Sequence, residues 1–214
     1  MRAGYMPAVG VAEFRDDMPE PQIEKADDVK IKIRNCGICG SEVHAIHGLH
    51  PFRIPPIVSG HEVAGDVVAV GEGVTKFKVG ARVTVEPHYG CGHCWYCDHG
   101  LYNVCPDKKV LGAGPWSGGL GEYIVTPEQT VVKLPDSLTY EEGALIEPVA
   151  NGMYAVRNSK IDEETNIVVI GCGPIGIGDF LCARLYDPRS ILMVDVADFN
   201  LQKAREMGAE LTCN

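Results

Sequence analysis

The chain has 214 residues, 45% of them hydrophobic, so it can bury the core of one large domain or two modest ones. Its formal net charge of −10, from 29 acidic and 19 basic side chains, would repel a phosphate backbone and argues against a nucleic-acid partner. No apolar run approaches the roughly 20 residues that cross a bilayer, and residues 1–11 lack the pattern of a secretory signal, which predicts a cytoplasmic protein without membrane contact.

The chain up to about residue 155 shows the pattern of short β-strands broken by glycine and proline. Apolar and charged residues alternate from Val29 to Ile33, which is typical of a half-buried strand. Further β-rich runs follow at 63–70, 82–86, 122–126 and 130–134. The density of proline and glycine argues against long helices here. An all-β, barrel-like region is predicted.

A different pattern begins at about residue 157. It predicts strand, helix, strand and helix in turn, at 166–170, 174–186, 191–194 and 199–207, with 210–213 as the start of a third strand. This alternation is typical of a parallel doubly wound sheet. Because a complete dinucleotide-binding fold has two such halves and only the first is present, we expect either a fragment or a truncated protein.

Four of the nine cysteines, Cys91, Cys94, Cys97 and Cys105, have the spacing C-x2-C-x2-C-x7-C. Tight turns at such gaps direct thiolates at one Zn²⁺, and four thiolates leave no open coordination position. In a chain without an export signal this predicts a structural zinc rather than disulfides. Two alternatives are four unligated thiols and an iron–sulfur cluster. Pro106 after Cys105 favours the cluster, but the last gap in bacterial ferredoxins is three residues rather than seven.

The segment Gly171-Cys172-Gly173-Pro174-Ile175-Gly176 matches G-x-G-x-x-G between a predicted strand and a predicted helix. In that context the N–H groups that begin the helix would bind the pyrophosphate of a dinucleotide. Asp195 ends the next strand 19 residues after Gly176, close to the spacing of a carboxylate that binds the adenosine ribose. Such a carboxylate would repel a 2′-phosphate, which favours NAD over NADP. An ordinary glycine turn with a solvated Asp195 is the alternative.

Possible metal ligands also occur in three short segments, residues 39–44, 60–62 and 147–148. Their spacing alone does not establish a metal site. Together with the cysteine cluster and the glycine turn, they stand in the order seen in the medium-chain dehydrogenase/reductase family. Over essentially all 214 residues the sequence resembles the zinc-dependent alcohol dehydrogenases, most of all the sorbitol (L-iditol), butanediol and threonine dehydrogenases. The resemblance implies a GroES-like β-barrel catalytic domain over 1–156, followed by the first half of a Rossmann domain over 157–214.

The resemblance also implies a catalytic zinc. Cys39 and His61 would bind it, and Glu147 lies where the polyol branch places its carboxylate ligand. Glu62 would be a neighbouring or exchanging ligand, so which of the two glutamates is the third ligand stays open. A zinc with three protein ligands keeps a position for the alcohol oxygen and lowers the pKa of that alcohol. Two zinc ions and NAD(H) are the expected cofactors, and an alcohol or polyol is the expected substrate.

Two side chains near Cys39 are implied to carry protons, and a third departs from the family pattern. Ser41 matches the hydroxyl that takes the proton of the substrate, and His44 matches its onward relay. Glu42 stands where the family usually has aspartate. Relatives form dimers or tetramers, so a homo-oligomer is expected. A truncated, catalytically inactive zinc-binding scaffold or interaction protein is the alternative function. The zinc-free quinone reductases are disfavoured, because they lack the cysteine cluster.

Overall fold

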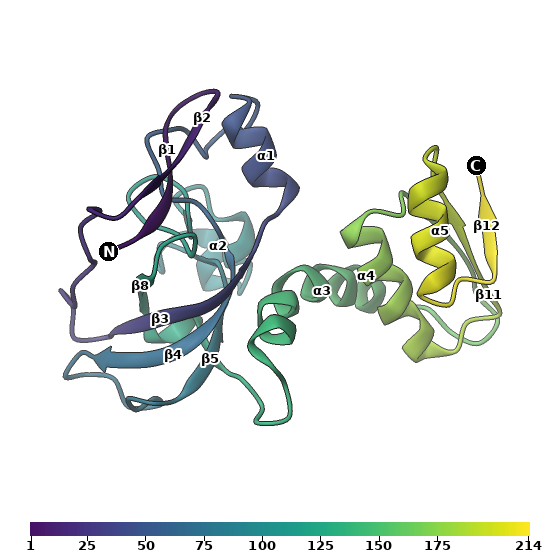
Figure 1. The fold of residues 1–214 in the computed structure, drawn as a ribbon. Coiled ribbons are helices and arrows are strands. Elements are labelled where there is room, and N and C mark those ends of the chain that lie inside the picture. Colours follow the sequence, from purple (N-terminus) through teal and green to yellow (C-terminus); the bar gives the residue numbers. More distant parts are fainter. The chain divides into compact units, whose positions relative to one another are not determined.

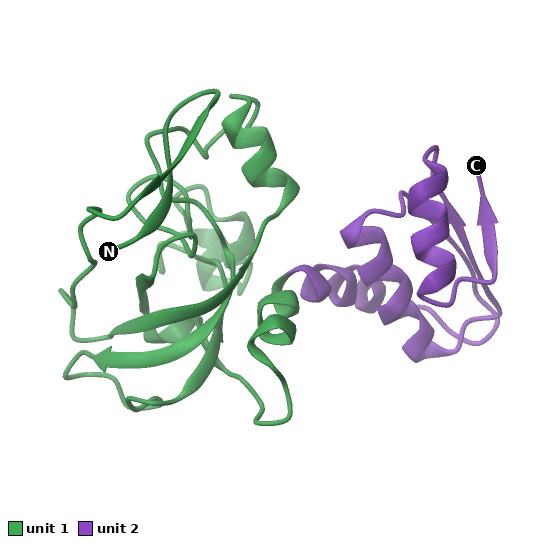
Figure 2. Cartoon of the chain, viewed as in Figure 1, with its two compact units in different colours: residues 1–147 green, residues 148–214 purple.

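The computed structural model describes residues 1–214 (Figure 1). It contains two compact units, Met1–Glu147 and Pro148–Asn214, which Figure 2 colours separately. The predicted domain boundary after residue 156 lies near the end of helix α3 (Tyr140–Asn158), the helix in which the first unit ends and the second begins. None of the helices combines the length and the apolar composition needed to cross a membrane.

The first unit is built on one curled antiparallel sheet. Its strand order is β8-β3-β4-β5-β9, with bounds Tyr123–Pro127, Asp28–Gly37, Glu62–Val70, Arg82–Val85 and Val131–Lys133. The two edge strands follow each other in the chain across a single 3-10 turn, Glu128–Thr130. The sheet therefore curves round into a half-barrel, as the sequence predicts. Its core consists of Val29, Ile31, Val63, Val67, Val83, Val85, Leu111, Ile124 and Val131.

Smaller elements surround this sheet. They are the paired strands β1 (Ala3–Ala8) and β2 (Val11–Arg15), helix α1 (Gly40–Ile46), the paired strands β6 (His88–Tyr89) and β7 (Lys109–Val110), helix α2 (Trp95–Asp98) and the 3-10 turn Tyr102–Val104. The pairing of β6 with β7 joins the two ends of the segment 90–108. All four clustered cysteines lie in that segment.

Helix α3 contradicts the expectation that proline and glycine exclude long helices from this part of the chain. It spans 19 residues and contains Pro148. A capping box begins it: the Thr139 hydroxyl accepts the N–H of Glu142 at 3.2 Å, and the Glu142 carboxylate accepts the N–H of Thr139 at 2.7 Å. The T-x-x-E pattern is the sequence signal for this start, and it outweighs the propensity argument.

The second unit confirms the predicted alternation. Strands β10 (Asn166–Ile170), β11 (Ser190–Val194) and β12 (Leu211–Cys213) pair in parallel in that order. Helix α4 (Pro174–Ala183), extended by the 3-10 turn Arg184–Tyr186, and helix α5 (Asp198–Glu206) connect them. Met193, Leu201 and Ala204 are almost completely buried between the sheet and the helices. This is the beginning of a doubly wound sheet.

Glycine allows α3 and α4 to pack closely in the second unit. A Cβ atom on Gly152 would lie 2.6 Å from the carbonyl carbon of Gly178 and 2.7 Å from the nitrogen of Asp179. Helix backbones can approach this closely only where a side chain is missing. Gly178 lies in the interior of α4, where glycine costs about 1 kcal/mol relative to alanine. The close packing accounts for Gly152 of α3. A Cβ atom on Gly178 itself would lie 3.6 Å from the carbonyl oxygen of Pro148, an ordinary contact, so nothing in the structure explains this second glycine.

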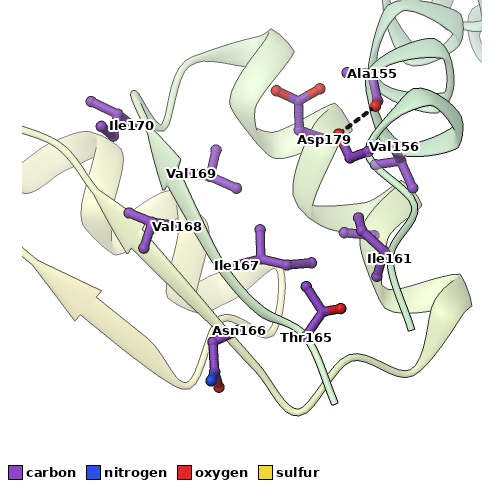
Figure 3. Close-up of a pocket in the computed structure, with 12 residues that line it drawn as sticks. Ala155, Val156, Ile161, Thr165, Asn166, Ile167, Val168, Val169, Ile170 and Asp179 are labelled. Carbon is purple, nitrogen blue, oxygen red and sulfur yellow. Dashed lines mark hydrogen bonds between the residues drawn. The ribbon is translucent and has the colours of Figure 1, made fainter. Parts of the chain in front are cut away.

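Asp179 is the one side chain of α4 that the packing leaves unsatisfied. Its Oδ1 atom is buried without a hydrogen-bond partner, beside a hollow between α3, α4 and β10 (Figure 3). Burial raises the pKa of this carboxyl above its ordinary value of 3.8. A raised folded-state pKa means that the folded chain holds the proton more tightly than the unfolded chain. The free energy of unfolding therefore falls as the pH rises from 3.8 through the folded value.

We therefore expect Asp179→Ala to stabilise the protein by about 1 kcal/mol near neutral pH, the usual cost of an unsatisfied buried polar group. The gain in Tm should be larger at about pH 7 than at about pH 4, because a larger fraction of the carboxyl is protonated at the lower pH. Thermal unfolding followed by circular dichroism at both pH values checks this. Glu163→Ala, at an exposed acid of the same unit, is the control. Equal gains in Tm at both pH values would show that the higher helix propensity of alanine alone stabilises the Asp179→Ala variant.

Candidate metal centres and cofactor turn

The four clustered cysteines converge on one point. The sulfur atoms of Cys91, Cys94, Cys97 and Cys105 all lie within 4.8 Å of one another. Individual sulfur–sulfur distances are 3.6 Å, 3.7 Å and 4.0 Å, for the pairs Cys94–Cys97, Cys94–Cys105 and Cys91–Cys97. A tetrahedral zinc with Zn–S bonds of about 2.3 Å has sulfur–sulfur edges of about 3.8 Å. The cluster thus has the size that one zinc ion requires, and its sulfurs are too far apart for disulfides.

Local backbone features hold this arrangement. Gly92 and Gly100 adopt positive φ angles of 79° and 73°, which a side chain would strain. A Cβ atom on Gly90 would overlap the sulfur of Cys97. The backbone N–H of Cys91 donates to the sulfur of Cys105 at 3.4 Å, and this hydrogen bond is the main reason that the pKa of Cys105 falls to about 7. A thiol with that pKa is readily available as a thiolate ligand.

The predicted catalytic ligands lie around His61. Two groups of ligand atoms share this histidine, each with all its atoms within 4.8 Å of one another: Cys39, Glu42 and His61 form one, and His61, Glu62 and Glu147 form the other. These side chains come from the start of α1, the start of β4 and the middle of α3. His61 and Glu62 are each only 7% exposed. The structure therefore brings together side chains that are more than a hundred positions apart in the sequence.

Glu42 has a role in this site that the sequence does not reveal. Its Oε1 atom lies 3.0 Å from Nδ1 of His61 and accepts the Ser59 hydroxyl at 2.8 Å. Burial would raise the pKa of Glu42, but the hydrogen bonds of His61 and Ser59 and the charge of Arg53 outweigh it and lower the pKa to about 2. The carboxylate is thus ionised and bound to one ring nitrogen of His61. The other nitrogen, Nε2, is left as the one suited to a metal.

The two predicted proton carriers differ in their surroundings. The Ser41 hydroxyl is buried and has no hydrogen-bond partner in the structure. Buried polar atoms are rarely left in this state, so a partner from outside the chain is suited to this position. His44 lies on the exposed side of α1, and no hydrogen bond joins its side chain to Ser41. A relay from Ser41 to His44 stays a prediction.

The three glycines of the G-x-G-x-x-G segment, two before α4 and one in its first turn, have three distinct geometries. Gly171 has a φ angle of 103°, which forms the tight turn after β10. Gly173 has no atom within 4 Å of where a Cβ would stand, so its backbone is open to a ligand. A Cβ atom on Gly176 would overlap the carbonyl oxygen of Gly171. Turn, close approach and helix–strand packing are the roles that a dinucleotide-binding turn assigns to its glycines.

Asp195 lies against this same turn. Its carboxylate accepts the N–H of Cys172 at 2.7 Å and the N–H of Ala197 at 2.8 Å, and the Asn200 amide donates to it at 3.1 Å. The hydrogen bond from Cys172 is the largest cause of the lowered pKa of Asp195. These contacts fix an ionised carboxylate next to the turn. Its binding of a ribose stays a prediction.

The geometry of the turn predicts opposite outcomes for two alanine substitutions. We expect Gly176→Ala to destabilise the second unit by about 1–3 kcal/mol, the cost of overpacking a rigid site. Gly173→Ala, with free space and a φ angle of −74°, should retain the stability of the protein but weaken dinucleotide binding. Thermal unfolding and titration with NADH fluorescence measure the two effects. Equal losses of stability in both variants would contradict this assignment.

Known proteins match the chain over both units. The family model for the alcohol dehydrogenase GroES-like domain matches residues 25–136. Sorbitol dehydrogenase of Bacillus subtilis strain 168 is 39% identical over 197 residues, covering 91% of this chain and 56% of that protein. The chain spans little more than half the length of the curated relatives it matches, between 51% and 58%.

Two solved structures with bound dinucleotides align with all of this chain. One is a short chain alcohol dehydrogenase of Escherichia coli CFT073 complexed with cofactor NADH, with a TM-score of 0.90 and 33% identity over 62% of that chain. The other is a zinc-binding dehydrogenase of Sinorhizobium meliloti 1021 bound to NADP, with a TM-score of 0.90 and 32% identity over 61% of that chain. The relatives therefore include proteins with either dinucleotide.

Proposed function

The chain belongs to the zinc-dependent alcohol dehydrogenases of the medium-chain family, and we propose that it acts in the NAD-linked oxidation of a secondary alcohol or polyol to a ketone. The observation that carries this proposal is the cluster around His61. There Cys39, Glu62 and Glu147 offer metal ligands in the same unit as the buried, unpartnered hydroxyl of Ser41. Similarity to an L-idonate 5-dehydrogenase, a sorbitol dehydrogenase and an (R,R)-butanediol dehydrogenase supports this class of substrate.

The donor set fits a zinc ion. Cys39 and Glu147 each have a ligand atom within 4.8 Å of His61, in the two separate groups that share this histidine. As zinc ligands the three would offer one thiolate, one neutral imidazole and one carboxylate, whose two negative charges balance a divalent cation. Binding both Glu62 and Glu147 at once would leave the site negative, so we assign one glutamate at a time. When bound, zinc supplies the Lewis acidity that makes an alcohol acidic near neutral pH. Four cysteine thiolates, which leave no open position, make the other site structural.

The chain's own residues then have separate tasks. The Ser41 hydroxyl accepts the proton of the substrate alcohol, and His44 carries it toward solvent. The backbone N–H groups at the start of α4 hold the pyrophosphate of the cofactor, and Asp195 accepts a ribose hydroxyl. The bound cofactor supplies the hydride acceptor. NAD is proposed over NADP because the ionised carboxylate of Asp195 lies at the turn, where it would repel a 2′-phosphate.

An assay of NADH formation on a panel of polyols and secondary alcohols tests the proposal. Ser41→Ala is expected to lower kcat by about 10²–10⁴-fold, the usual contribution of a positioned proton acceptor, while zinc content stays unchanged. Ser41→Thr, which keeps a hydroxyl, should recover part of the rate. A full rate in Ser41→Ala would remove this residue from the reaction, and no turnover of any alcohol by the wild type would remove the proposed activity.

The alternative function, an inactive zinc-binding scaffold, gains no support from the relatives named above, which are dehydrogenases. Assembly into a dimer or tetramer stays a prediction.

A further inference from the structure

Glu42 joins two of the proposed zinc ligands through a single carboxylate. Its Oε2 atom accepts the backbone N–H of Cys39 at 2.9 Å, which closes a capping box at the start of α1. Its Oε1 atom contacts Nδ1 of His61 at 3.0 Å. A capping box uses glutamate or glutamine at this position because the side chain must reach back to the first residue of the helix. This explains why glutamate occurs at position 42.

Arg53 provides the positive charge beside this carboxylate. Its guanidinium is 3% exposed, and Glu42 is 5% exposed, so the pair is almost wholly removed from water. Nη1 of Arg53 lies 3.5 Å from Oε1 of Glu42. The same nitrogen donates to the carbonyl oxygens of Leu111 and Gly112 at 3.0 Å and 2.9 Å, which anchor the guanidinium to the core of the first unit.

Burying the ion pair of Arg53 and Glu42 costs free energy of folding, so its presence calls for an explanation. Removing two charges from water costs several kcal/mol for each ion, and well-packed apolar residues are often as stable. Nε of Arg53 is buried without a partner, so the guanidinium is not fully satisfied even in this position. The carboxylate that the pair fixes is the one that orients His61.

We propose that Arg53 is a positioning residue for the metal site around His61: it holds Glu42 in the one conformation in which its carboxylate binds both the backbone of Cys39 and the ring of His61. The inference rests on the proposed zinc site but concerns how that site is held. Without Arg53, the carboxylate loses its buried counter-charge and the ring of His61 loses its fixed orientation. Partners that orient a metal-binding histidine commonly contribute 10–100-fold in metal affinity.

Cobalt binding to the full 214-residue chain tests this, because the visible spectrum of Co²⁺ reports the ligands of each site and needs no catalytic activity. The affinity of the second site is measured by competition with a chelator. We expect Arg53→Met to weaken this site by about 10–100-fold while the thiolate spectrum of the four-cysteine cluster is unchanged. Arg34→Met removes an exposed arginine that pairs with Asp66 at 2.6 Å on the same sheet, and it should leave both sites intact.

A double variant separates positioning from general stability. If Arg53 acts through Glu42, then Arg53→Met should cause almost no further loss in a Glu42→Gln background, since coupled residues are not additive. Arg53→Lys, which keeps the charge, should recover part of the affinity. Wild-type affinity in Arg53→Met, or additive losses in the double variant, would overturn the inference. A wild-type chain that binds no second metal would instead overturn the proposed catalytic site.

Discussion

Replacing Cys97 by serine is expected to remove the metal from the four-cysteine cluster and to unfold the segment between β6 and β7. This segment has almost no core of its own: helix α2 and the following 3-10 turn contain no buried residue, and Cys105 is the only buried apolar side chain within it. Structural zinc sites contribute on the order of 10 kcal/mol to the folding of such segments. We therefore expect the metal to stabilise this segment in place of a hydrophobic core.

Limited proteolysis and elemental analysis check this expectation. Cys97→Ser should lose one zinc per chain and become sensitive to cleavage within 90–108, while the sheet of the first unit remains folded. Cys213→Ser, at an exposed cysteine of the second unit, should change neither property. A Cys97→Ser protein that keeps its full metal content and its resistance to protease would show that the cluster is not a metal site.

Replacing His61 by alanine is expected to have the largest effect on activity. His61 belongs to both ligand groups of the proposed catalytic site, so its loss leaves neither group complete. Losing the Lewis acid removes several kcal/mol of electrostatic stabilisation, which corresponds to a decrease in kcat of about 10³-fold or more. Steady-state rates and zinc content should fall together, with the cysteine cluster still loaded. His99→Ala, at an exposed histidine that stacks on Trp95, is the matched control.

Steady-state rates and zinc content of variants at two glutamates decide which of these glutamates is the third ligand. Both Glu62 and Glu147 have a carboxylate oxygen within 4.8 Å of a ring nitrogen of His61. We expect Glu147→Gln to lose the second zinc, as His61→Ala does, and Glu62→Gln to retain it with a changed rate. The reverse result would assign the metal to Glu62. If His61→Ala keeps both its zinc ions and its rate, the proposed site is wrong.

Local patterns in the sequence predict some parts of this structure well. Strand β10 contains four consecutive β-branched residues and is followed by a glycine turn, and β11 is a short apolar run of strand length. For each of them a strand is the interpretation that fits both the length and the neighbouring residues. The cysteine cluster is equally local, because its four ligands lie within one short segment between two paired strands. In these places the nearest neighbours in the chain are also the nearest neighbours in space.

Other parts depend on contacts that no local pattern shows. The glycines of helix α3 and its Pro148 argue against a helix at the level of sequence, although the capping box at Thr139 marks its start. The pair of Arg53 and Glu42 forms only when the loop before β4 folds against α1, so spacing cannot predict it. Gly152 of α3 is required only because the backbone of Gly178 in α4 packs against it, a contact that no pattern within α3 shows. Resemblance to a family predicts the ligands around His61. The structure adds the contacts that Glu42 makes with Cys39 and His61.

Elemental analysis of zinc and iron in the purified 214-residue protein tests the central claim most directly. Two zinc ions per chain and no iron are predicted, one in the cysteine cluster and one beside His61. A single zinc would contradict the site around His61 as an assembled metal centre. Iron accompanied by labile sulfide would contradict the assignment of the cysteine cluster.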